Sequence, residues 1–449
     1  MLLSPRTSLY LSRGSHTSTR SGKRSLATLS QSIPADSVSR SHKVVIVGGG
    51  SAGLTIGHQL LRSGRFARDD IAVIDPAEWH HYQAGWTLVG GGLKKKDQLR
   101  RPLASLIDPK IYHYNDKVQS FKPDQNTISL GNGKHVSYDQ LVVCPGIRVD
   151  FGSIKGLAEA IHDPHSPVSS TYSYETCDKV ARNIANFKKG RALFTHPSGI
   201  VKCAGAPQKI MWLALDAWRR AGFYDPDSSR SDIQISFATA MPVMFGVPKY
   251  SQTLNDLRTK RGVEGLFEHD LVAIEGNTAV LARPDGQVVK KHFDFLHAVP
   301  KMGPHDFVKN SALANDAGLV DVDQAVLRHK TFDNVWSCGD ASGLPTSKTA
   351  AAITAQAPVL VANLLSTMEN QPPVAVYNGY TSCPLTTGYG KVMLAEFVYG
   401  GKPHETFGTL IDQSTPRRAF YHLKKDFFPW VYYKSMVKGT WAGPKGWMK

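Results

Sequence analysis

Two of the five cysteines, Cys203 and Cys383, stand in settings that favour a reactive thiol. Cys203 follows Lys202 and lies just before a helix that is predicted to begin near Pro207. A neighbouring cation and a helix N-terminus both favour the thiolate, which is the nucleophilic form of cysteine. Cys383 lies in a polar, turn-rich segment, residues 380–388, that does not resemble core sequence. The two residues therefore predict thiol-based redox chemistry.

The other three cysteines are interpreted as small buried residues, because Cys144 and Cys338 lie in apolar strand patterns and Cys177 lies at a predicted helix start. Five cysteines in 449 residues are too few for a disulfide framework. No Cys-x-x-Cys pair occurs, and the neighbouring His80 and His81 are expected to point in different directions. The sequence therefore predicts no metal site.

A glycine-rich turn near the N-terminus has the pattern of a dinucleotide-binding site. The apolar run 44–47 predicts a buried strand, a Gly-x-Gly-x-x-Gly pattern follows it, and an apolar helix pattern begins near Leu54. The glycines of such a motif allow a tight turn, the close approach of a pyrophosphate, and close packing of the helix on the strand. A second predicted strand, 70–75, ends in an acid whose carboxylate can accept hydrogen bonds from ribose hydroxyls. The residues expected to contact the dinucleotide here are Gly48, Gly50, Ser51, Ala52, Gly53 and Asp75.

Two further segments resemble the FAD fingerprints of the two-dinucleotide-binding-domain flavoproteins. Residues 331–340 predict a strand that delivers a Gly-Asp pair to the ribityl and pyrophosphate region of the cofactor. Residues 138–146 resemble the Ala-Thr-Gly-like turn of that family, with Cys144-Pro145 as a local departure. The small residues of 345–353 begin a helix whose free N–H groups can receive a flavin phosphate or ring edge.

The resemblance implies FAD as the cofactor. Trp79, Tyr82 and Trp86 follow the first strand-helix-strand unit and either line the flavin together with Gln83 or are ordinary core aromatics; the sequence leaves both open. The further residues expected to contact the cofactor are Gln83, Val118, Gly146, Asp340, Lys348, Thr349, Ala350 and Ala351.

The chain is predicted to be an α/β protein with two Rossmann-like dinucleotide-binding domains, the first of them discontinuous. In the second, the turn 196–207 has no glycine triplet, and no acid follows the second strand. This domain therefore lacks a nicotinamide signature, and the sequence argues against NAD(P)H as the electron donor. The assignments are a FAD domain at 43–165 and 300–373, a second Rossmann-like domain at 166–299, and a C-terminal domain with membrane-interface helices at 374–449.

The two ends of the chain carry most of its formal net charge of +16. Residues 1–42 hold six Lys/Arg, many Ser/Thr and one acid, which is typical of a mitochondrial transit peptide, although a basic disordered tail has the same composition. Residues 416–449 hold eight Lys/Arg, one acid and nine aromatic residues. Trp and Tyr mixed with Lys and Arg predict helices at a membrane interface, and a C-terminal helix docked on its own domain is the alternative.

The middle of the chain is nearly neutral, so no nucleic-acid partner is expected. No uninterrupted apolar run of about 18 residues occurs, so the chain is expected to lie on a membrane surface without a spanning helix.

The sequence as a whole resembles the mitochondrial sulfide:quinone oxidoreductases. The resemblance rests on the FAD fingerprints, the Cys203 turn without a nicotinamide site, the segment Ser382-Cys383-Pro384-Leu385, and the basic aromatic tail. It implies that Cys203 and Cys383 lie on the re face of the flavin, bridged through sulfane sulfur. Cys144 lies near the region of a further cysteine of the bacterial enzymes, but its strand-ending turn does not support that role.

The resemblance also implies the partners and the location of the protein. Hydrogen sulfide is the expected substrate, ubiquinone the electron acceptor, and a small thiol or sulfite the sulfur acceptor. The expected location is the mitochondrial inner membrane, where the protein is peripheral and monotopic.

In the mechanism that the resemblance implies, hydrosulfide attacks a disulfide or trisulfide between the two cysteines and leaves a persulfide on Cys203 and a thiolate on Cys383. The flavin then takes up two electrons and passes them to ubiquinone. Two other functions fit the same motifs: a type II NADH:quinone oxidoreductase of the same fold, and a non-enzymatic flavin-binding membrane adaptor. Reduction by NADH would mark the first, and partner binding that survives replacement of either cysteine would mark the second.

Overall fold

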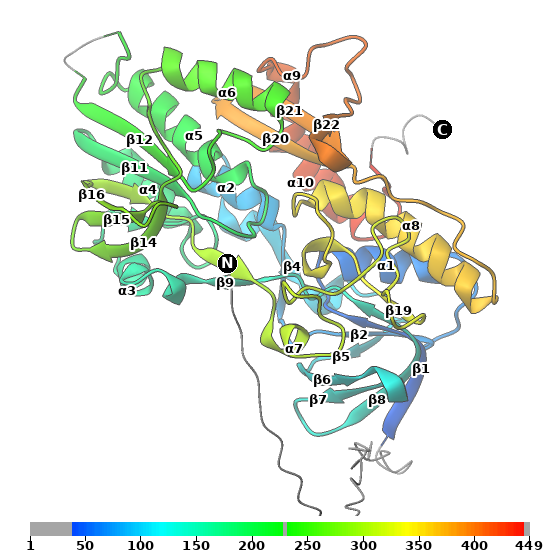
Figure 1. The fold of residues 1–449 in the computed structure, drawn as a ribbon. Coiled ribbons are helices and arrows are strands. Elements are labelled where there is room, and N and C mark those ends of the chain that lie inside the picture. Colours follow the sequence, from blue (N-terminus) through cyan, green and yellow to red (C-terminus); the bar gives the residue numbers. More distant parts are fainter. Residues whose placement is uncertain (1–37, 228–230, 444–449) are drawn as a thin grey trace, which may run out of the picture.

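The computed structural model describes residues 38–227 and 231–443. Its first domain is built on a seven-stranded sheet in which β5, β2, β1 and β8 are parallel neighbours (Figure 1). Because β19 pairs with β8 from far along the chain, this domain is discontinuous, and the predicted α/β class is confirmed. The strands are β1 (Val38–Val47), β2 (Ile71–Ile74), β5 (Tyr112–Tyr114), β6 (Val118–Lys122), β7 (Thr127–Leu130), β8 (His135–Val143) and β19 (Val335–Trp336).

The turn between β1 and helix α1 (Ser51–Arg62) carries the Gly-x-Gly-x-x-Gly pattern. The backbone of Gly48 has a φ of +104°, a region that favours glycine. A Cβ at Gly53 would lie 1.9 Å from the carbonyl oxygen of Gly48, so only glycine lets the helix begin this close to the strand. The N-terminus of α1 therefore lies close to the C-terminal end of the buried strand β1.

The second domain contains a five-stranded parallel sheet in the order β10-β17-β11-β12-β13. Helix α5 (Ala206–Arg220) follows β11 and packs on this sheet, with Ile210, Met211 and Trp212 fully buried. An antiparallel meander of β14 (Asp270–Glu275), β15 (Thr278–Ala282) and β16 (Val288–His292) lies at the edge of the domain (Figure 1). The strands of the sheet are β10 (Val168–Ser169), β11 (Gly190–His196), β12 (Ile233–Thr239), β13 (Glu264–Phe267) and β17 (Phe295–His297).

The C-terminal part adds a small antiparallel sheet of β20 (Thr381–Gly388), β21 (Lys391–Val398) and β22 (Lys402–Pro403). Cys383, Leu385 and Met393 belong to the same hydrophobic core as the second domain, because β20 packs on α5. A three-stranded sheet has too little apolar surface for a core of its own. β20 and β21 thus share a core with the second domain, while Val392 and Leu394 form a small separate cluster with Phe420 and Tyr421.

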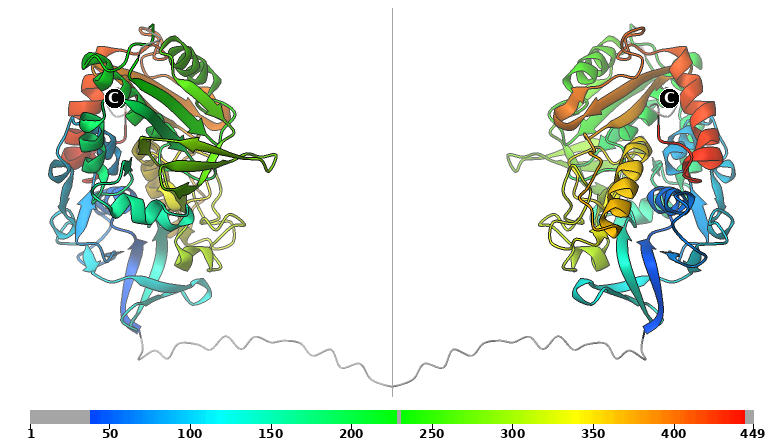
Figure 2. Two further views of the ribbon diagram at one scale, coloured as in Figure 1. Left: turned by 90° about the vertical axis from the view of Figure 1, so that its left-hand side faces the viewer. Right: turned by 90° about the vertical axis from the view of Figure 1, so that its right-hand side faces the viewer.

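A helical segment ends the described chain and runs along one side of the molecule, where it is drawn in red (Figure 2). It begins at Arg418 and ends at Met436, and part of it is wound as a π-helix. Its parts are α9 (Arg418–His422), η9 (Leu423–Phe427), α10 (Phe428–Val431) and η10 (Tyr432–Met436).

Helix α8 (Ala350–Met368) corrects the expectation that no helix has the length and composition of a membrane span. Its 19 residues are long and apolar enough, by length and composition alone, to cross a membrane. However, 56% of this apolar stretch is buried inside the protein, and α8 packs on α1. Core helices of soluble proteins have the same properties, so α8 is weak support for a span.

The first strand begins earlier than the boundary expected from composition. β1 starts at Val38, within the range 1–42 assigned to a leader, and residues 38–42 pair with β8. His42 is 3% exposed, and its ring nitrogens hydrogen-bond to the Asp69 carbonyl at 2.6 Å and to the Tyr114 hydroxyl at 2.9 Å. Residues 1–37 lie outside the described part of the chain, so the leader itself stays a prediction.

A truncation tests whether residues 38–42 belong to the folded unit. A chain that begins at Lys43 loses the hydrogen bonds of His42 and the first part of β1. Its free energy of unfolding is expected to be about 1–3 kcal/mol lower than that of a chain that begins at Val38. Urea unfolding followed by fluorescence measures this difference, and equal midpoints for the two chains would contradict the assignment.

Candidate active site

The two thiols predicted from the sequence lie against each other. Cys203 follows β11 in the turn before α5, and Cys383 is the third residue of β20. Their sulfur atoms are 3.2 Å apart although 180 positions separate them, and both are free thiols. A covalent S–S bond needs about 2.05 Å, so a short movement would bridge them. The turn occupies the place where a nicotinamide-binding domain carries its glycine-rich cradle.

The backbone holds Cys203 in place. Its φ is +55°, a left-handed value that is uncommon for residues other than glycine. The N–H of Cys203 donates to the Lys348 carbonyl at 2.8 Å, and the N–H of Ala206 donates to the Cys203 carbonyl at 2.7 Å. Strained backbone of this kind persists only where its surroundings fix it. The turn of the second domain is thereby tied to the segment that precedes α8.

A buried ammonium group completes the cluster. Nζ of Lys209, in the first turn of α5, donates to Cys203 Sγ at 3.3 Å, and Lys209 is 2% exposed. The hydrogen bond from the Cys383 thiol, and then the charges of Lys209 and Lys424, lower the pKa of Cys203 well below its ordinary value, although burial opposes the shift. The same hydrogen bond, together with burial, raises the pKa of Cys383. Cys203 is therefore the thiolate of the pair and Cys383 the protonated partner.

Lysines also respond to the sulfur pair. Burial alone would lower the pKa of Lys209, but the charge on the two sulfurs raises it above its ordinary value. Lys424, which comes from η9 and is 3% exposed, donates to the Ala84 carbonyl at 2.9 Å. Burial and repulsion by Lys209 lower the pKa of Lys424 to about 7. One of the two lysines is thus firmly charged, and the other changes charge near neutral pH.

A cavity of about 480 Å³ opens beside Cys203. It lies between the first domain, the Cys203 turn and the C-terminal helical segment, and its size is that of a site for a small molecule or cofactor. The residues expected from the sequence that line it are Gly50, Ser51, Ala52, Asp75, Gln83, Gly146, Cys203, Asp340, Lys348, Thr349, Ala350 and Ala351.

Four expected residues do not line this cavity. Gly48 and Gly53 act through the backbone turn described above, and Cys383 lies behind Cys203, with its neighbours Ser382 and Pro384 at the cavity wall. Val118 lies in β6 at the far edge of the sheet, with its side chain 7% exposed in the core. The structure therefore gives Val118 no contact with the cavity through its side chain.

The glycine-rich end of the cavity has the features of a pyrophosphate cradle. No heavy atom outside the immediate chain lies within 4 Å of a Cβ built on Gly50, so the space in front of this residue is open. Gly50 is the N-cap of α1 and supplies no side-chain cap to the first N–H groups of the helix. Asp75 accepts hydrogen bonds from Gly49 N–H at 2.6 Å and Ala77 N–H at 2.8 Å, which fixes its carboxylate at the end of β2.

Charged groups line the opposite part of the cavity. Burial raises the pKa of Asp340, while the positive charges of Lys202 and Lys348 oppose that shift. Burial lowers the pKa of Lys348 to about 8, and its ammonium donates to the Ser342 carbonyl at 2.6 Å. Lys202 Nζ donates to Gln83 Oε1 at 3.0 Å, so the expected Gln83 lies next to the Cys203 turn. Asp340, the acid of the second FAD fingerprint, therefore lies near Lys202 and Cys203.

The aromatic residues that follow the first strand-helix-strand unit also face this space. Trp79, Tyr82 and Trp86 line the cavity together with Gln83. The indole N–H of Trp86 and Nδ1 of His81 are buried and have no hydrogen-bond partner within the described parts of the chain. Both atoms are fully covered by protein, so neither faces the open part of the cavity.

The C-terminal helical segment forms part of the cavity instead of lying wholly on the surface. The Tyr432 hydroxyl contacts Ser51 Oγ at 2.6 Å and His80 Nε2 at 2.7 Å, while His80 Nδ1 lies 3.0 Å from the Gly49 carbonyl. Because burial lowers the pKa of His80 to about 4, the ring is neutral at neutral pH. Its Nδ1 must then donate to the Gly49 carbonyl, and its Nε2 accepts from Tyr432. The segment is thus hydrogen-bonded to the glycine-rich turn.

Aromatic residues of this segment divide into two groups. Phe420, Tyr421 and Tyr432 are buried, as the docked-helix alternative requires, whereas Trp430 is 58% exposed. Trp447 lies outside the described residues. Within the described ranges, no group of three or more His, Cys, Asp or Glu residues is arranged to hold a metal ion.

Sequence reasoning missed Lys209 and Lys424. Lys209 lies six positions after Cys203, in the first turn of a predicted helix, and that spacing was a usable signal. Lys424 reaches the site from 221 positions away, and no local pattern marks it.

Comparison with known proteins agrees with this arrangement. Residues 42–182 match the Pyridine nucleotide-disulphide oxidoreductase family. The chain is 47% identical over 440 residues to the mitochondrial sulfide:quinone oxidoreductase of Schizosaccharomyces pombe, which covers 93% of this chain and 95% of that protein. It is 40% identical over 408 residues to the mitochondrial sulfide:quinone oxidoreductase of Mus musculus, covering 90% and 88% of the two chains.

A solved structure shows the same fold. The sulfide:quinone oxidoreductase from the hyperthermophilic bacterium Aquifex aeolicus superposes with a TM-score of 0.70 at 18% identity, covering 88% of this chain and 92% of that one. Together with the identities above, which extend over nearly the whole length, this decides the family. The chain belongs to the sulfide:quinone oxidoreductase family.

Proposed function

We propose that this chain is a FAD-dependent enzyme that oxidises hydrogen sulfide at the Cys203–Cys383 pair and passes two electrons to ubiquinone. The observation that carries the proposal is the pair itself: two free cysteine sulfurs 3.2 Å apart, one of them 3.3 Å from the buried Lys209 ammonium, beside a cavity that suits a dinucleotide. A membrane adaptor has no use for a thiol of lowered pKa held by a buried lysine. Sulfide oxidation requires a nucleophilic sulfur next to an electron acceptor.

The family implies a flavin, and the cavity residues fit FAD in particular. The N-terminus of α1 and the open space at Gly50 suit a pyrophosphate. Asp75 uses part of its acceptor capacity on two N–H groups, which leaves lone pairs for ribose hydroxyls. Asp340 and the N-terminus of α8 would hold the ribityl chain and the ring. A bound flavin would supply a two-electron acceptor beside the thiols.

The chemical steps at the cysteines follow from thiol exchange. Hydrosulfide attacks one sulfur of the bridge between Cys203 and Cys383, forms a persulfide there, and releases the other cysteine as a thiolate. This exchange moves no electrons out of the sulfur atoms. The oxidation is the re-formation of the bridge, because closing a new sulfur–sulfur bond releases two electrons, which a bound flavin would accept. The added sulfur either stays in the bridge or leaves with an acceptor.

The electrostatics of the pair suggest which cysteine leaves. The thiol of lower pKa is the better leaving group, and the Lys209 ammonium stabilises a thiolate on Cys203. Leaving-group strength therefore favours attack at Cys383, with the persulfide on Cys383 and the thiolate on Cys203. Access from the cavity favours attack at Cys203, because Cys203 lines the cavity and Cys383 is 1% exposed behind it. The second polarity is the one that the sequence resemblance implied.

The remaining partners are proposed from the chemistry of the products. A persulfide carries an electrophilic outer sulfur, so a small thiol or sulfite can attack it and take that sulfur away. The apolar part of the cavity suits a quinone ring. The residues that line this part are Leu394, Phe407, Leu423, Phe428, Val431 and Trp441.

The same region supports a peripheral position on a membrane. Phe427 packs at tilted or edge-on angles against Phe428, Trp441 and the exposed Trp430, with ring centroids 5.8–6.0 Å apart. Aromatic rings beside lysines are typical of protein surfaces at headgroup depth. We place this surface on the mitochondrial inner membrane, where a quinone would reach the cavity from the lipid.

Anaerobic flavin bleaching tests the proposed activity. Anaerobic mixing with sulfide should bleach the flavin of the purified protein. Later addition of a short-chain quinone should restore the colour of the oxidised flavin. NADH should leave the spectrum unchanged, because the second domain has no nicotinamide cradle. Bleaching by NADH but not by sulfide would replace the proposal by a type II NADH:quinone oxidoreductase.

Replacing either cysteine should abolish sulfide oxidation. Cys203→Ser and Cys383→Ser each remove one sulfur of the bridge, so the rate of flavin reduction by sulfide is expected to fall by about 10³-fold or more. Cys177→Ala, a buried cysteine of helix α4 (Cys177–Asn186) outside the cavity, serves as the matched control. If both serine variants kept normal turnover, the cysteine mechanism would be wrong.

The charge of Lys209 should set the acid limb of the reaction. The Cys203 thiolate is present above its lowered pKa and is lost as the pH falls through that value. In Lys209→Met the pKa of Cys203 rises, and the acid limb of flavin reduction should move upwards by about 1–3 pH units. Lys209→Arg keeps a cation and should stay close to the unchanged protein. Superimposable profiles for Met and the parent lysine would show that Lys209 does not stabilise the thiolate.

A further inference from the structure

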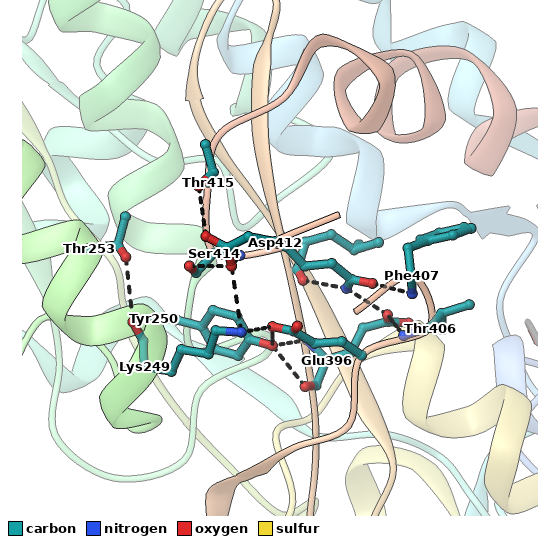
Figure 3. Close-up of polar contacts among 12 residues, drawn as sticks. Lys249, Tyr250, Thr253, Glu396, Thr406, Phe407, Asp412, Ser414 and Thr415 are labelled. Atoms are coloured by element: carbon teal, nitrogen blue, oxygen red, sulfur yellow. Dashed lines mark hydrogen bonds and ion pairs between the residues drawn. The ribbon is translucent and has the colours of Figure 1, made fainter. Parts of the chain in front are cut away.

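A buried carboxylate with no assigned role lies on the strand next to Cys383. Glu396 is in β21, where it pairs with Ser382 of β20, and it is 2% exposed. Its carboxylate accepts four hydrogen bonds: from the Tyr380 hydroxyl at 2.5 Å, Thr406 Oγ1 at 2.9 Å, Thr406 N–H at 2.8 Å, and Gln413 Nε2 at 2.8 Å. Figure 3 shows Glu396 beside Thr406. Glu396 and Tyr380 both line the cavity.

No basic side chain neutralises this group. Within residues 38–227 and 231–443, Glu396 takes part in no ion pair with Lys, Arg or His. A charge out of water is costly unless hydrogen bonds replace its hydration, and here four neutral donors do so. An apolar residue at this position would avoid that cost, so the distinct contribution of Glu396 is the hydrogen bonding that fixes its donors in place.

Three of the four hydrogen bonds come from one segment, residues 404–415, that folds back over β21, and the fourth comes from Tyr380. Gln413 binds Glu396, donates also to the Leu394 carbonyl at 2.9 Å, and accepts from Phe407 N–H at 2.5 Å. Phe407 in turn lines the apolar part of the cavity. Glu396 therefore fixes, through Thr406 and Gln413, the position of one aromatic wall of the cavity.

The tip of the same segment is exposed and apolar. Leu410 is 85% exposed and Ile411 is 36% exposed. A second contact ties the segment to helix α6 (Pro248–Lys260), because Glu405 accepts from Lys249 Nζ at 2.8 Å and from the Tyr250 hydroxyl at 2.9 Å (Figure 3). Glu396 and helix α6 thus both hold the segment. Phe407, which lines the cavity, lies in the chain between Thr406, which binds Glu396, and the exposed Leu410.

We propose that Glu396 is a positioning residue for the quinone half of the reaction, which holds segment 404–415 so that Phe407 forms the wall against which the quinone ring packs. The proposal rests on the proposed function, because it assigns the apolar part of the cavity to quinone. Glu396 transfers no electrons or protons in this role. Its effect on the sulfide half of the reaction is small, since Cys203 and Lys209 make no contact with the segment.

Glu396→Gln is the decisive variant. A glutamine replaces the charged acceptor by a neutral amide: its oxygen can still accept from the two N–H donors and its NH₂ group can donate to the Tyr380 and Thr406 hydroxyls, so weaker bonds hold the segment with little change in shape. The KM for a short-chain quinone is expected to rise about tenfold, while the rate of anaerobic flavin bleaching by sulfide stays within about twofold. Thr406→Val removes one donor and should give a smaller rise in KM, which keeps the test open if the glutamine variant folds poorly.

A double-mutant cycle with Phe407→Ala separates positioning from a general structural effect. If Glu396 acts through Phe407, the quinone KM of Glu396→Gln combined with Phe407→Ala should equal that of Phe407→Ala alone. Additive effects, an unchanged quinone KM in Glu396→Gln, or a parallel loss of sulfide bleaching would each overturn the proposal. If the unsubstituted protein bleached with sulfide but gave no turnover with quinone, the proposed function itself would fail.

Discussion

The candidate site depends on one backbone hydrogen bond that fixes the turn between β11 and α5. The Cys203 N–H donates to the Lys348 carbonyl, so the turn of the second domain is joined to the start of α8 in the first. That contact holds Cys203 in a left-handed conformation, over the cavity and against Cys383 and Lys209. The side chains of Cys203, Cys383 and Lys209 are all shielded from solvent. A buried ammonium group shifts the pKa of a neighbouring thiol far more than an ammonium group at the surface does. The reactivity of Cys203 is therefore a consequence of how the two domains are packed.

The last part of the chain contributes side chains to the site itself. β20 supplies Cys383 and shares its core with α5, while the C-terminal helical segment supplies Lys424 beside the sulfur pair and Tyr432 beside the glycine-rich turn. The hydrogen-bond chain from Ser51 through Tyr432 and His80 to the Gly49 carbonyl fixes two residues of the dinucleotide cradle from the far end of the sequence. The proposed flavin site, the sulfur pair and the apolar region proposed for quinone thus share one wall, so the surface that we propose to lie on the membrane would be close to the buried thiols.

The sequence predicted the parts of this arrangement that local patterns encode. β1, the glycine turn and α1 follow from an apolar run and a glycine spacing, and Asp75 follows from its place at the end of β2. The meeting of Cys203 and Cys383 could not be worked out from spacing, and only the family resemblance suggested it. Lys424 had no local signal, because its contact with Ala84 spans 340 positions. Glu396 had none because its partners, 10 to 17 positions away, are brought to it only by the fold of the C-terminal part. The start of β1 at Val38 was missed because basic, Ser-rich composition masked the strand pairing.

The central claim is that Cys203 and Cys383 form one sulfur-bridged unit during turnover. Mass spectrometry of the protein, quenched with an alkylating agent during turnover with sulfide and quinone, measures this directly. The account predicts a cross-linked peptide pair that contains both cysteines, with a population that carries one additional sulfur atom between them. Recovery of the two cysteines only as separately alkylated peptides, under conditions in which sulfide is being consumed, would contradict it.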